Sequence, residues 1–174
     1  GVVHTLNVYD KDGSGNRSAQ TSFLFAVAPG GAAIAEWNFE SGGVDTGTGV
    51  GTPALVTHPL SFTGGAGTSS AKSRLGAALD LNGSESAETT GFVDATQDFT
   101  VGAWVRLPSL STRQVVVSQS GGTGRVFELA FDPASGWVFC RDSGDSGTAV
   151  RSCATSLSKP VAGVWTYVNG TYDR

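Results

Sequence analysis

The residues with the clearest chemical potential form the tetrapeptide Gly-Asp-Ser-Gly at positions 144–147. In this pattern Ser146 could act as a nucleophile, provided that a general base and an orienting acid accompany it. The chain has only two histidines, His4 and His58, and neither lies in the Ala-Ala-His-Cys segment that such hydrolases use. Thr148 also stands where Gly-Pro would follow. We therefore interpret the tetrapeptide as a polar hairpin tip and expect that this chain is not an enzyme.

Two further segments imitate ligand-binding loops. Asp10–Gly15 begins like a calcium-binding EF-hand loop, but Thr21 occupies position twelve, where a bidentate Glu is required. Gly47–Gly51 has a glycine spacing similar to that of a phosphate-binding loop, but Pro53 follows it and no Lys does. We interpret both segments as turns or loops.

The acidic residues do not predict a glycosidase. Glycosidases that are β-sandwiches place three carboxylates on one face of a strand, with a period of two residues. Glu85 and Glu88 have the wrong spacing for this pattern, and we expect both to lie in a loop.

Cys140 and Cys153 are the only cysteines, and they flank a turn-rich segment. If the flanking residues pair as antiparallel strands around positions 146 and 147, the two cysteines face each other across a hairpin. A disulfide there would stabilise the fold by about 3 kcal/mol on the chain-entropy model. Zinc would need two more ligands, and no other Cys or His lies near in the sequence. A disulfide is favoured over two unpaired buried thiols, which predicts an oxidising, extracytoplasmic setting.

Composition limits the partners. Charged residues make up only 15% of the chain, while nine Phe, four Trp and three Tyr supply enough apolar surface for a core. The net charge of −4 leaves no basic patch for a phosphate backbone, so we expect no nucleic-acid partner. No apolar run approaches the roughly 20 residues that span a bilayer, so we expect no membrane insertion. The absence of Met, even at position 1, predicts an interior piece of a longer protein.

Alternating apolar residues indicate an all-β protein built from many short strands. Turn residues separate these strands, which is typical of an antiparallel sandwich or barrel. The glycine-rich stretch 42–51 and the polar run 63–73 have no periodicity and are expected to be loops. The expected strands are 2–9, 21–27, 34–39, 77–81, 99–107, 115–118, 126–131, 137–141, 149–153 and 165–172.

Several segments resemble conserved stretches of known extracellular domains. Four of them, in order, are similar to the strand motifs of laminin-G-like, concanavalin A-type jelly-roll domains. Residues 1–29 resemble the last two strands of an immunoglobulin- or fibronectin-III-like domain. The resemblance thus divides the chain into the end of that domain, 1–29, and a jelly-roll domain, 30–174. The four similar segments are Ala35–Gly43, Leu75–Gly83, Phe99–Arg106 and Val164–Asp173.

This resemblance implies an antiparallel β-sandwich that lacks its C-terminal strands, after a two-strand remnant of an Ig-like sandwich. The version with a disulfide across a hairpin resembles domains of large secreted bacterial, especially actinobacterial, proteins. It also implies a structural calcium ion held by Glu40, Asp173 and backbone carbonyls. The segment Asp45–Gly49 departs from the family pattern, so part of the loop around that calcium site is altered.

The function that the resemblance implies is non-catalytic recognition or adhesion, directed at carbohydrate, within a secreted or cell-surface protein. The partner would be a glycan or another extracellular or cell-surface ligand. Two alternatives remain open: a spacer module without a ligand, and an accessory domain of a secreted hydrolase. Trp37, Trp104, Trp137 and Trp165 are all expected in the core. The sequence therefore names no ligand-contact residue.

Overall fold

The computed structural model describes residues 2–8, 21–27, 33–47, 57–74, 76–122, 125–146 and 148–174. Within these ranges the chain forms β-strands and no helix, so no helix that could cross a membrane is found there. The chain divides into two compact units, Gly1–Leu60 and Ser61–Arg174. The predicted domain boundary between residues 29 and 30 lies outside the described residues and stays a prediction.

The first unit contains one antiparallel strand pair, as the alternation predicted. β1 (Val2–Val8) pairs with β2 (Thr21–Val27) in a register that joins Val2 to Val27 and Val8 to Thr21. The segment Asp10–Gly15, considered above as a calcium loop, lies outside the described residues.

The described segments 33–47 and 57–60 of the first unit are joined by the carboxylate of Asp45. Its oxygens accept hydrogen bonds from the backbone N–H groups of Glu36 (3.0 Å), Gly47 (2.8 Å) and His58 (2.8 Å). Burial by itself would raise the pKa of Asp45, but the three N–H donors together outweigh it and lower the pKa below its ordinary value. Trp37 completes the network by donating from Nε1 to the carbonyl of His58 at 2.8 Å.

The expected strand at 34–39 is wrong. No ladder forms there, because the backbone of this segment pairs with loop residues instead: Thr46 donates its N–H to the carbonyl of Glu36 at 2.7 Å. Phe39 then takes a left-handed conformation (φ 65°), which a strand does not allow. The predicted loop at 42–51 is confirmed for its described part, 42–47.

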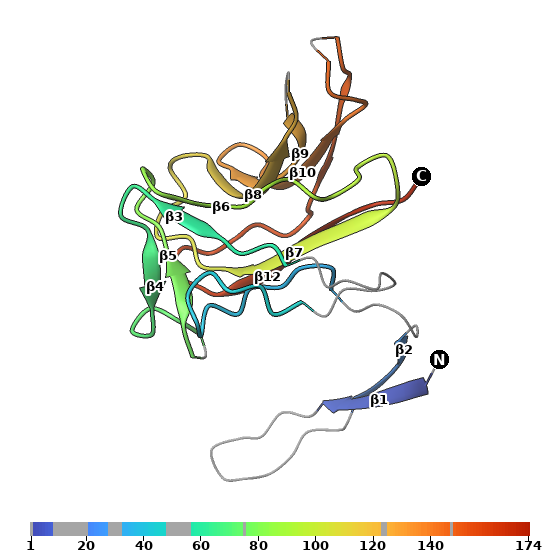
Figure 1. Ribbon diagram of the computed structural model, residues 1–174. Coiled ribbons are helices and arrows are strands. Elements are labelled where there is room, and N and C mark those ends of the chain that lie inside the picture. The colour runs from blue at the N-terminus through green and yellow to red at the C-terminus, as the bar shows by residue number, and fades with distance from the viewer. Residues whose placement is uncertain are drawn as a thin grey trace. The chain divides into compact units, whose positions relative to one another are not determined.

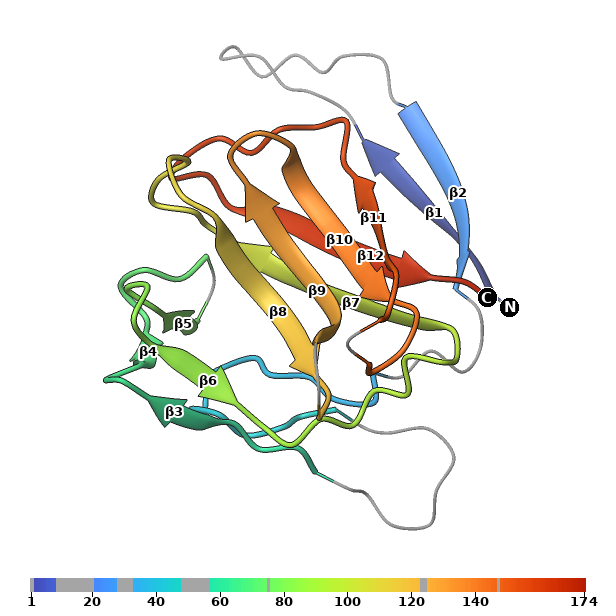
Figure 2. The same ribbon diagram turned by 90° about the horizontal axis from the view of Figure 1, so that it is seen from above.

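The second unit is an antiparallel sandwich, which confirms the predicted all-β fold class. One layer is the four-stranded sheet β11-β10-β9-β8, and the other layer contains the ribbon of β7 and β12 (Figure 1). Seen from above, the four strands lie side by side in front of this ribbon (Figure 2). The bounds are β7 Phe99–Val105, β8 Gln114–Ser120, β9 Arg125–Asp132, β10 Gly136–Asp142, β11 Arg151–Thr155 and β12 Thr166–Tyr172.

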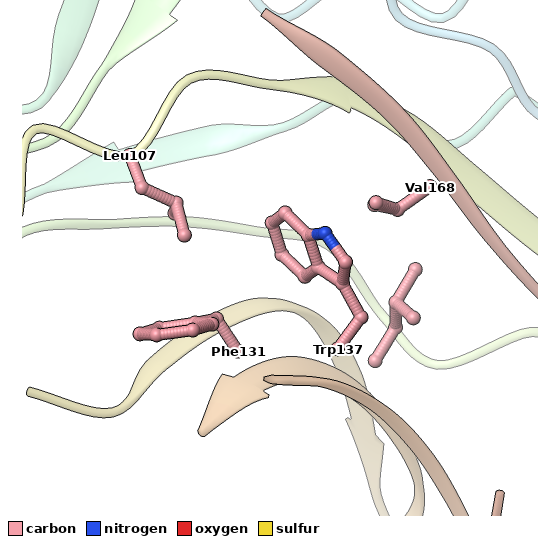
Figure 3. Packing of buried hydrophobic residues seen from close by; sticks show 5 residues of the cluster. Leu107, Phe131, Trp137 and Val168 are labelled. Carbon is pink, nitrogen blue, oxygen red and sulfur yellow. The ribbon is translucent and has the colours of Figure 1, made fainter. Parts of the chain in front are cut away.

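The core lies between these two layers. Phe131 of β9 and Trp137 of β10 meet edge to face with ring centroids 5.9 Å apart. Val168 of β12 and Leu107 face them, as Figure 3 shows. Alternation along β7 turns Val101 and Val105 toward the same cluster. The apolar residues of the sequence motifs are therefore those that join the two layers.

Gly170 of β12 lets the two layers approach closely. A Cβ atom at this position would overlap the ring of Phe139 on β10. Glycine is thus required by packing, because any larger residue would push the ribbon away from the four-stranded sheet. This contact explains why the Asn-Gly-Thr-Tyr segment of β12 contains a glycine on its inner face.

On the opposite face of β9, Glu128 is fully buried between two arginines. Its carboxylate forms ion pairs with Arg113 and Arg125. The hydrogen bond to Glu128 raises the pKa of Arg113 above its ordinary value. A carboxylate without water needs such partners, so this triad allows an acidic residue in the middle of the sheet.

Short strand pairs lie beside the sandwich. β3 (Ser61–Thr63) pairs with β6 (Ser86–Glu88), and β4 (Gly67–Ser69) pairs with β5 (Ala78–Asp80). The expectation that 63–73 contains no element is therefore wrong, because β4 lies within it. Strands of three residues are too short to show a periodicity of two in the sequence.

Candidate functional site

The hairpin of β10 and β11 carries the predicted disulfide. Cys140 and Cys153 are direct partners in the antiparallel register, with Cα atoms 4.1 Å apart, and they are bonded to each other. This register is the one expected for a hairpin centred on positions 146 and 147. The disulfide therefore closes the segment that contains the Gly-Asp-Ser-Gly tetrapeptide.

The described part of the tetrapeptide, residues 144–146, is exposed in the connection between β10 and β11. The carboxylate of Asp145 accepts a hydrogen bond from the N–H of Gly122, in the connection between β8 and β9. A Cβ atom at Gly121 would overlap that carboxylate, so the two turns are in tight contact. Ser146 has its hydroxyl 3.3 Å from that of Thr148. Asp145 thus connects the β10–β11 turn to the β8–β9 turn, which agrees with the interpretation of the tetrapeptide as part of a turn.

The acidic pair considered for glycosidase chemistry is also bound locally. Glu85 accepts hydrogen bonds from the backbone N–H (2.7 Å) and the side-chain amide (2.9 Å) of Asn82. Glu88 ends β6 rather than lying in a loop, and it accepts a hydrogen bond from Ser86 at 2.6 Å. Both carboxylates thus have partners within their own turn or strand.

The outer face of the β7–β12 ribbon, which points away from the four-stranded sheet, carries two aromatic side chains. Trp104 and Tyr167 are direct cross-strand partners, and their ring centroids are 5.5 Å apart. Trp104 is 49% exposed and Tyr167 is 55% exposed. We call this surface the aromatic face; its residues are Thr100, Gly102, Trp104, Tyr167, Asn169 and Thr171.

Polar groups and a glycine complete the aromatic face. The hydroxyl groups of Thr100 and Thr171 lie 3.0 Å apart across the two strands, and Asn169 is exposed between Thr171 and Tyr167. A Cβ atom at Gly102 would lie 2.6 Å from the phenol oxygen of Tyr167. The phenol therefore extends over Gly102, and the glycine leaves room for it on the sheet.

The expectation that all four tryptophans lie in the core is wrong for Trp104. It holds for Trp137, which is buried, while Trp37 and Trp165 are partly exposed. A signal was present in the sequence: along 99–105, Trp104 has the opposite parity to the apolar residues Val101 and Val105. Position parity therefore predicts an outward-facing tryptophan where aromatic composition alone predicts a core residue.

The two predicted calcium ligands, Glu40 and Asp173, both have exposed side chains. Glu40 follows Phe39 in the first unit, and Asp173 follows β12 in the second. Their carboxylates are the hard oxygen donors that calcium prefers, so the donor chemistry fits. Among the described residues, no three His, Cys, Asp or Glu side chains gather into a group that could hold a metal. A site made of two carboxylates and backbone carbonyls needs no such group of three side chains. The calcium site is therefore not tested by this finding and stays a prediction.

The fold defines a β-sandwich domain, in which two antiparallel layers enclose the core and one of them carries the exposed aromatic face. The family model of the concanavalin A-like lectin/glucanases superfamily, laminin G type, matches residues 81–174. This match covers more than half of the chain, so the chain belongs to this superfamily. No curated protein and no solved structure shows a significant match.

Membership of this superfamily indicates a carbohydrate- or ligand-binding module. The matched region contains β7 to β12 and therefore both layers of the sandwich, including the whole aromatic face. The predicted family and fold class are thus confirmed, and the candidate site lies on the part of the chain that carries them.

Proposed function

We propose that this chain is a non-catalytic, extracellular carbohydrate-binding module and that the aromatic face contacts the ligand. The observation that carries the proposal is the exposed pair of Trp104 and Tyr167, adjacent in register on one face of the ribbon. Sugar rings bind through their C–H faces to aromatic rings and through their hydroxyls to side-chain amides and hydroxyls. Asn169, Thr100 and Thr171 supply such polar groups beside the rings.

Exposure of these two rings to water is energetically unfavourable unless a ligand covers them. Trp and Tyr bury more apolar area than other side chains, so an unused pair is expected to turn inward or to be replaced by polar residues. The inner face of the same strands packs against the core, and neither ring is part of that core cluster. A ligand that covers them would account for their position.

A glycan-binding screen followed by calorimetry tests this proposal. With a glycan found in the screen, Trp104→Ala and Tyr167→Ala should each weaken binding about tenfold or more, as expected for aromatic anchors. Leu157→Ala is the matched control, since it removes an exposed apolar side chain elsewhere in the same unit. Unchanged affinity in both aromatic variants would contradict the proposed site.

The two alternatives predict different results. A spacer module would bind no glycan in the screen, and the aromatic variants would have no phenotype. An accessory domain of a hydrolase would bind the substrate of the neighbouring enzyme. Catalysis within this chain would be indicated by an activity that Ser146→Ala abolishes, which would contradict the non-catalytic proposal.

The extracellular setting rests on the disulfide. Cys140 and Cys153 are bonded, and disulfides form and persist in oxidising compartments. Expression in an oxidising and in a reducing compartment tests this proposal. We expect a higher yield of folded protein and an intact disulfide only in the oxidising compartment; equal yield and stability in both would argue against it.

We also propose that Glu40 and Asp173 bind a calcium ion. The ion would link two carboxylates that are distant in sequence and would thereby stabilise the fold. The melting temperature should then be higher in excess calcium than in chelator. Glu40→Gln and Asp173→Asn should each abolish this difference, while Glu36→Gln, an exposed acid in the same unit as Glu40, should keep it. No effect of calcium on the wild-type protein would contradict the proposal.

A further inference from the structure

Two arginines accompany the aromatic face. The guanidinium of Arg74 lies over the ring of Trp104, 4.1 Å from its centroid. Arg106 directly follows β7; it is exposed like positions 100, 102 and 104, and Leu107 after it is buried, so the alternation of the strand continues through Arg106. Neither arginine forms an ion pair with a residue that the structure describes.

Other arginines of the second unit are engaged elsewhere. Arg113 and Arg125 pair with Glu128, and Arg151 pairs with Asp142. Arg141 donates to the carbonyl of Ala95 at 2.8 Å and lies over the ring of Tyr172. These cations bond to a carboxylate or a carbonyl oxygen, whereas Arg74 contacts only the ring of Trp104 and neither it nor Arg106 donates a side-chain hydrogen bond to a residue that the structure describes.

The charge at the Trp104 end of the aromatic face differs from that of the whole chain. The chain has a net charge of −4, yet Arg74 lies over Trp104 and Arg106 follows the end of β7. The acids Asp98 and Asp173 flank the opposite end of the ribbon, beyond Thr100 and Thr171. Guanidinium groups form bidentate hydrogen bonds with carboxylates and sulfates, which neutral sugars do not offer. The arrangement thus combines stacking surface, hydrogen-bonding side chains and cations in one place.

On the basis of the proposed function, we infer that the ligand of the aromatic face is an anionic polysaccharide. Its carboxylate or sulfate groups would contact Arg74 and Arg106, while its rings lie against Tyr167 and the exposed part of Trp104. The polar side chains Asn169 and Thr171 favour a carbohydrate over an acidic peptide, because they can bond to the many hydroxyls of a sugar.

Calorimetric titration with four polysaccharides tests this inference. Polygalacturonate carries only carboxylates, dextran sulfate carries only sulfates, and neutral dextran and a neutral β-glucan carry neither. We expect binding of one or both anionic chains, at least tenfold tighter than that of either neutral chain and weaker as salt is raised. The carboxylate and sulfate arms show which anionic group the site prefers.

Arginine variants locate the effect. Arg106→Gln should weaken binding of the anionic chain about tenfold, which is the loss expected for one charge-assisted contact. Arg74→Gln should do the same. Lys159→Gln is the control: it removes one positive charge from a side chain that lies near Gly136, at the start of β10 in the other layer, and should leave affinity unchanged. An equal loss in the Lys159 variant would indicate a nonspecific charge effect and contradict the inference.

The outcomes separate this inference from the proposed function. Tight binding of a neutral chain that depends on Trp104 but not on Arg106 would overturn the anionic ligand and leave the aromatic face as a glycan site. Binding of an anionic chain that depends on Arg106 but not on Trp104 would contradict the aromatic face as the site. Binding of no polysaccharide would overturn both.

Discussion

The inner and outer faces of the β7–β12 ribbon have the same backbone but opposite surroundings. On the inner face, Val101 and Val168 pack against the core formed with β9 and β10. On the outer face, Trp104 and Tyr167 contact each other and remain half exposed. The comparison shows how strand alternation separates two environments within a few residues: one face joins the layers, and the other presents half-exposed aromatic side chains outside the core.

The two glycines of the ribbon sharpen this difference. Gly170 on the inner face allows the ring of Phe139 to lie against β12, so it serves packing. Gly102 on the outer face makes room for the phenol of Tyr167, so it shapes the aromatic face. The same residue type thus has a structural role on one side and a site-forming role on the other.

The largest expected effect comes from comparing a tryptophan of the core, Trp137 on β10, with the tryptophan of the aromatic face, Trp104 on β7. Trp137→Ala should lower the free energy of unfolding by about 3–5 kcal/mol, because it leaves a large cavity between the layers. Trp104→Ala should lower it by less than about 1 kcal/mol, because its side chain is half exposed. Urea unfolding of both variants measures the difference. Equal destabilisation would show that Trp104 belongs to the core.

Removal of the disulfide should have the next largest effect. The double variant Cys140→Ala with Cys153→Ala should lose about 3 kcal/mol, because the unfolded chain is no longer cross-linked. Since these residues lie away from the ribbon, ligand affinity of the folded variant should stay unchanged. Urea unfolding and calorimetry together check this prediction. A loss of affinity at a temperature where the variant is folded would contradict the independence of the hairpin and the aromatic face.

The two glycines should respond differently to alanine. Gly170→Ala should cost about 1–3 kcal/mol, because the new methyl group overlaps the ring of Phe139 and the layers must separate. Gly102→Ala should cost much less, since the new methyl group meets the far end of the exposed Tyr167 side chain, which can move aside. It should instead weaken ligand binding, because the moved ring disturbs the aromatic face. Thermal unfolding and titration of the two variants distinguish these effects, and the opposite pattern would reverse the assignment of the faces.

The smallest effect concerns pH and the first unit. The folded-state pKa of Asp45 lies below its ordinary value of 3.8, so its carboxylate stabilises the fold above that pH and stops doing so as pH falls through the folded-state pKa. Asp45→Asn should therefore cost about 1 kcal/mol at pH 7 and progressively less in acid. Melting temperatures at several pH values measure this trend, with Glu36→Gln, which replaces an exposed acid of the same unit, as control. A difference independent of pH would contradict the role of the carboxylate.

Much of the sandwich could be predicted from the sequence because its long strands alternate clearly. β7, β9, β10 and β12 were expected close to their observed bounds, and the turn centred on positions 146 and 147 correctly predicted the register that joins Cys140 to Cys153. In these segments local pattern and tertiary packing agree, so periodicity is sufficient.

The failures have physical causes. The segment 34–39 alternates like a strand, but Asp45 binds the backbone N–H of Glu36 in a contact that no local pattern shows. Trp104 was assigned to the core by its residue type, although its parity in β7 indicated the outer face. Arg74 contacts Trp104 from a turn thirty residues earlier in the chain, so this contact at the candidate site could not be predicted from the local sequence pattern.

The central claim is that the aromatic face binds a glycan and is not required for folding. The most direct test is calorimetric titration of Trp104→Ala and Leu157→Ala with a glycan that the wild-type protein binds, at a temperature where all three proteins are folded. The account predicts about tenfold weaker binding for Trp104→Ala, unchanged binding for Leu157→Ala, and nearly equal melting temperatures. Wild-type affinity in Trp104→Ala would contradict it.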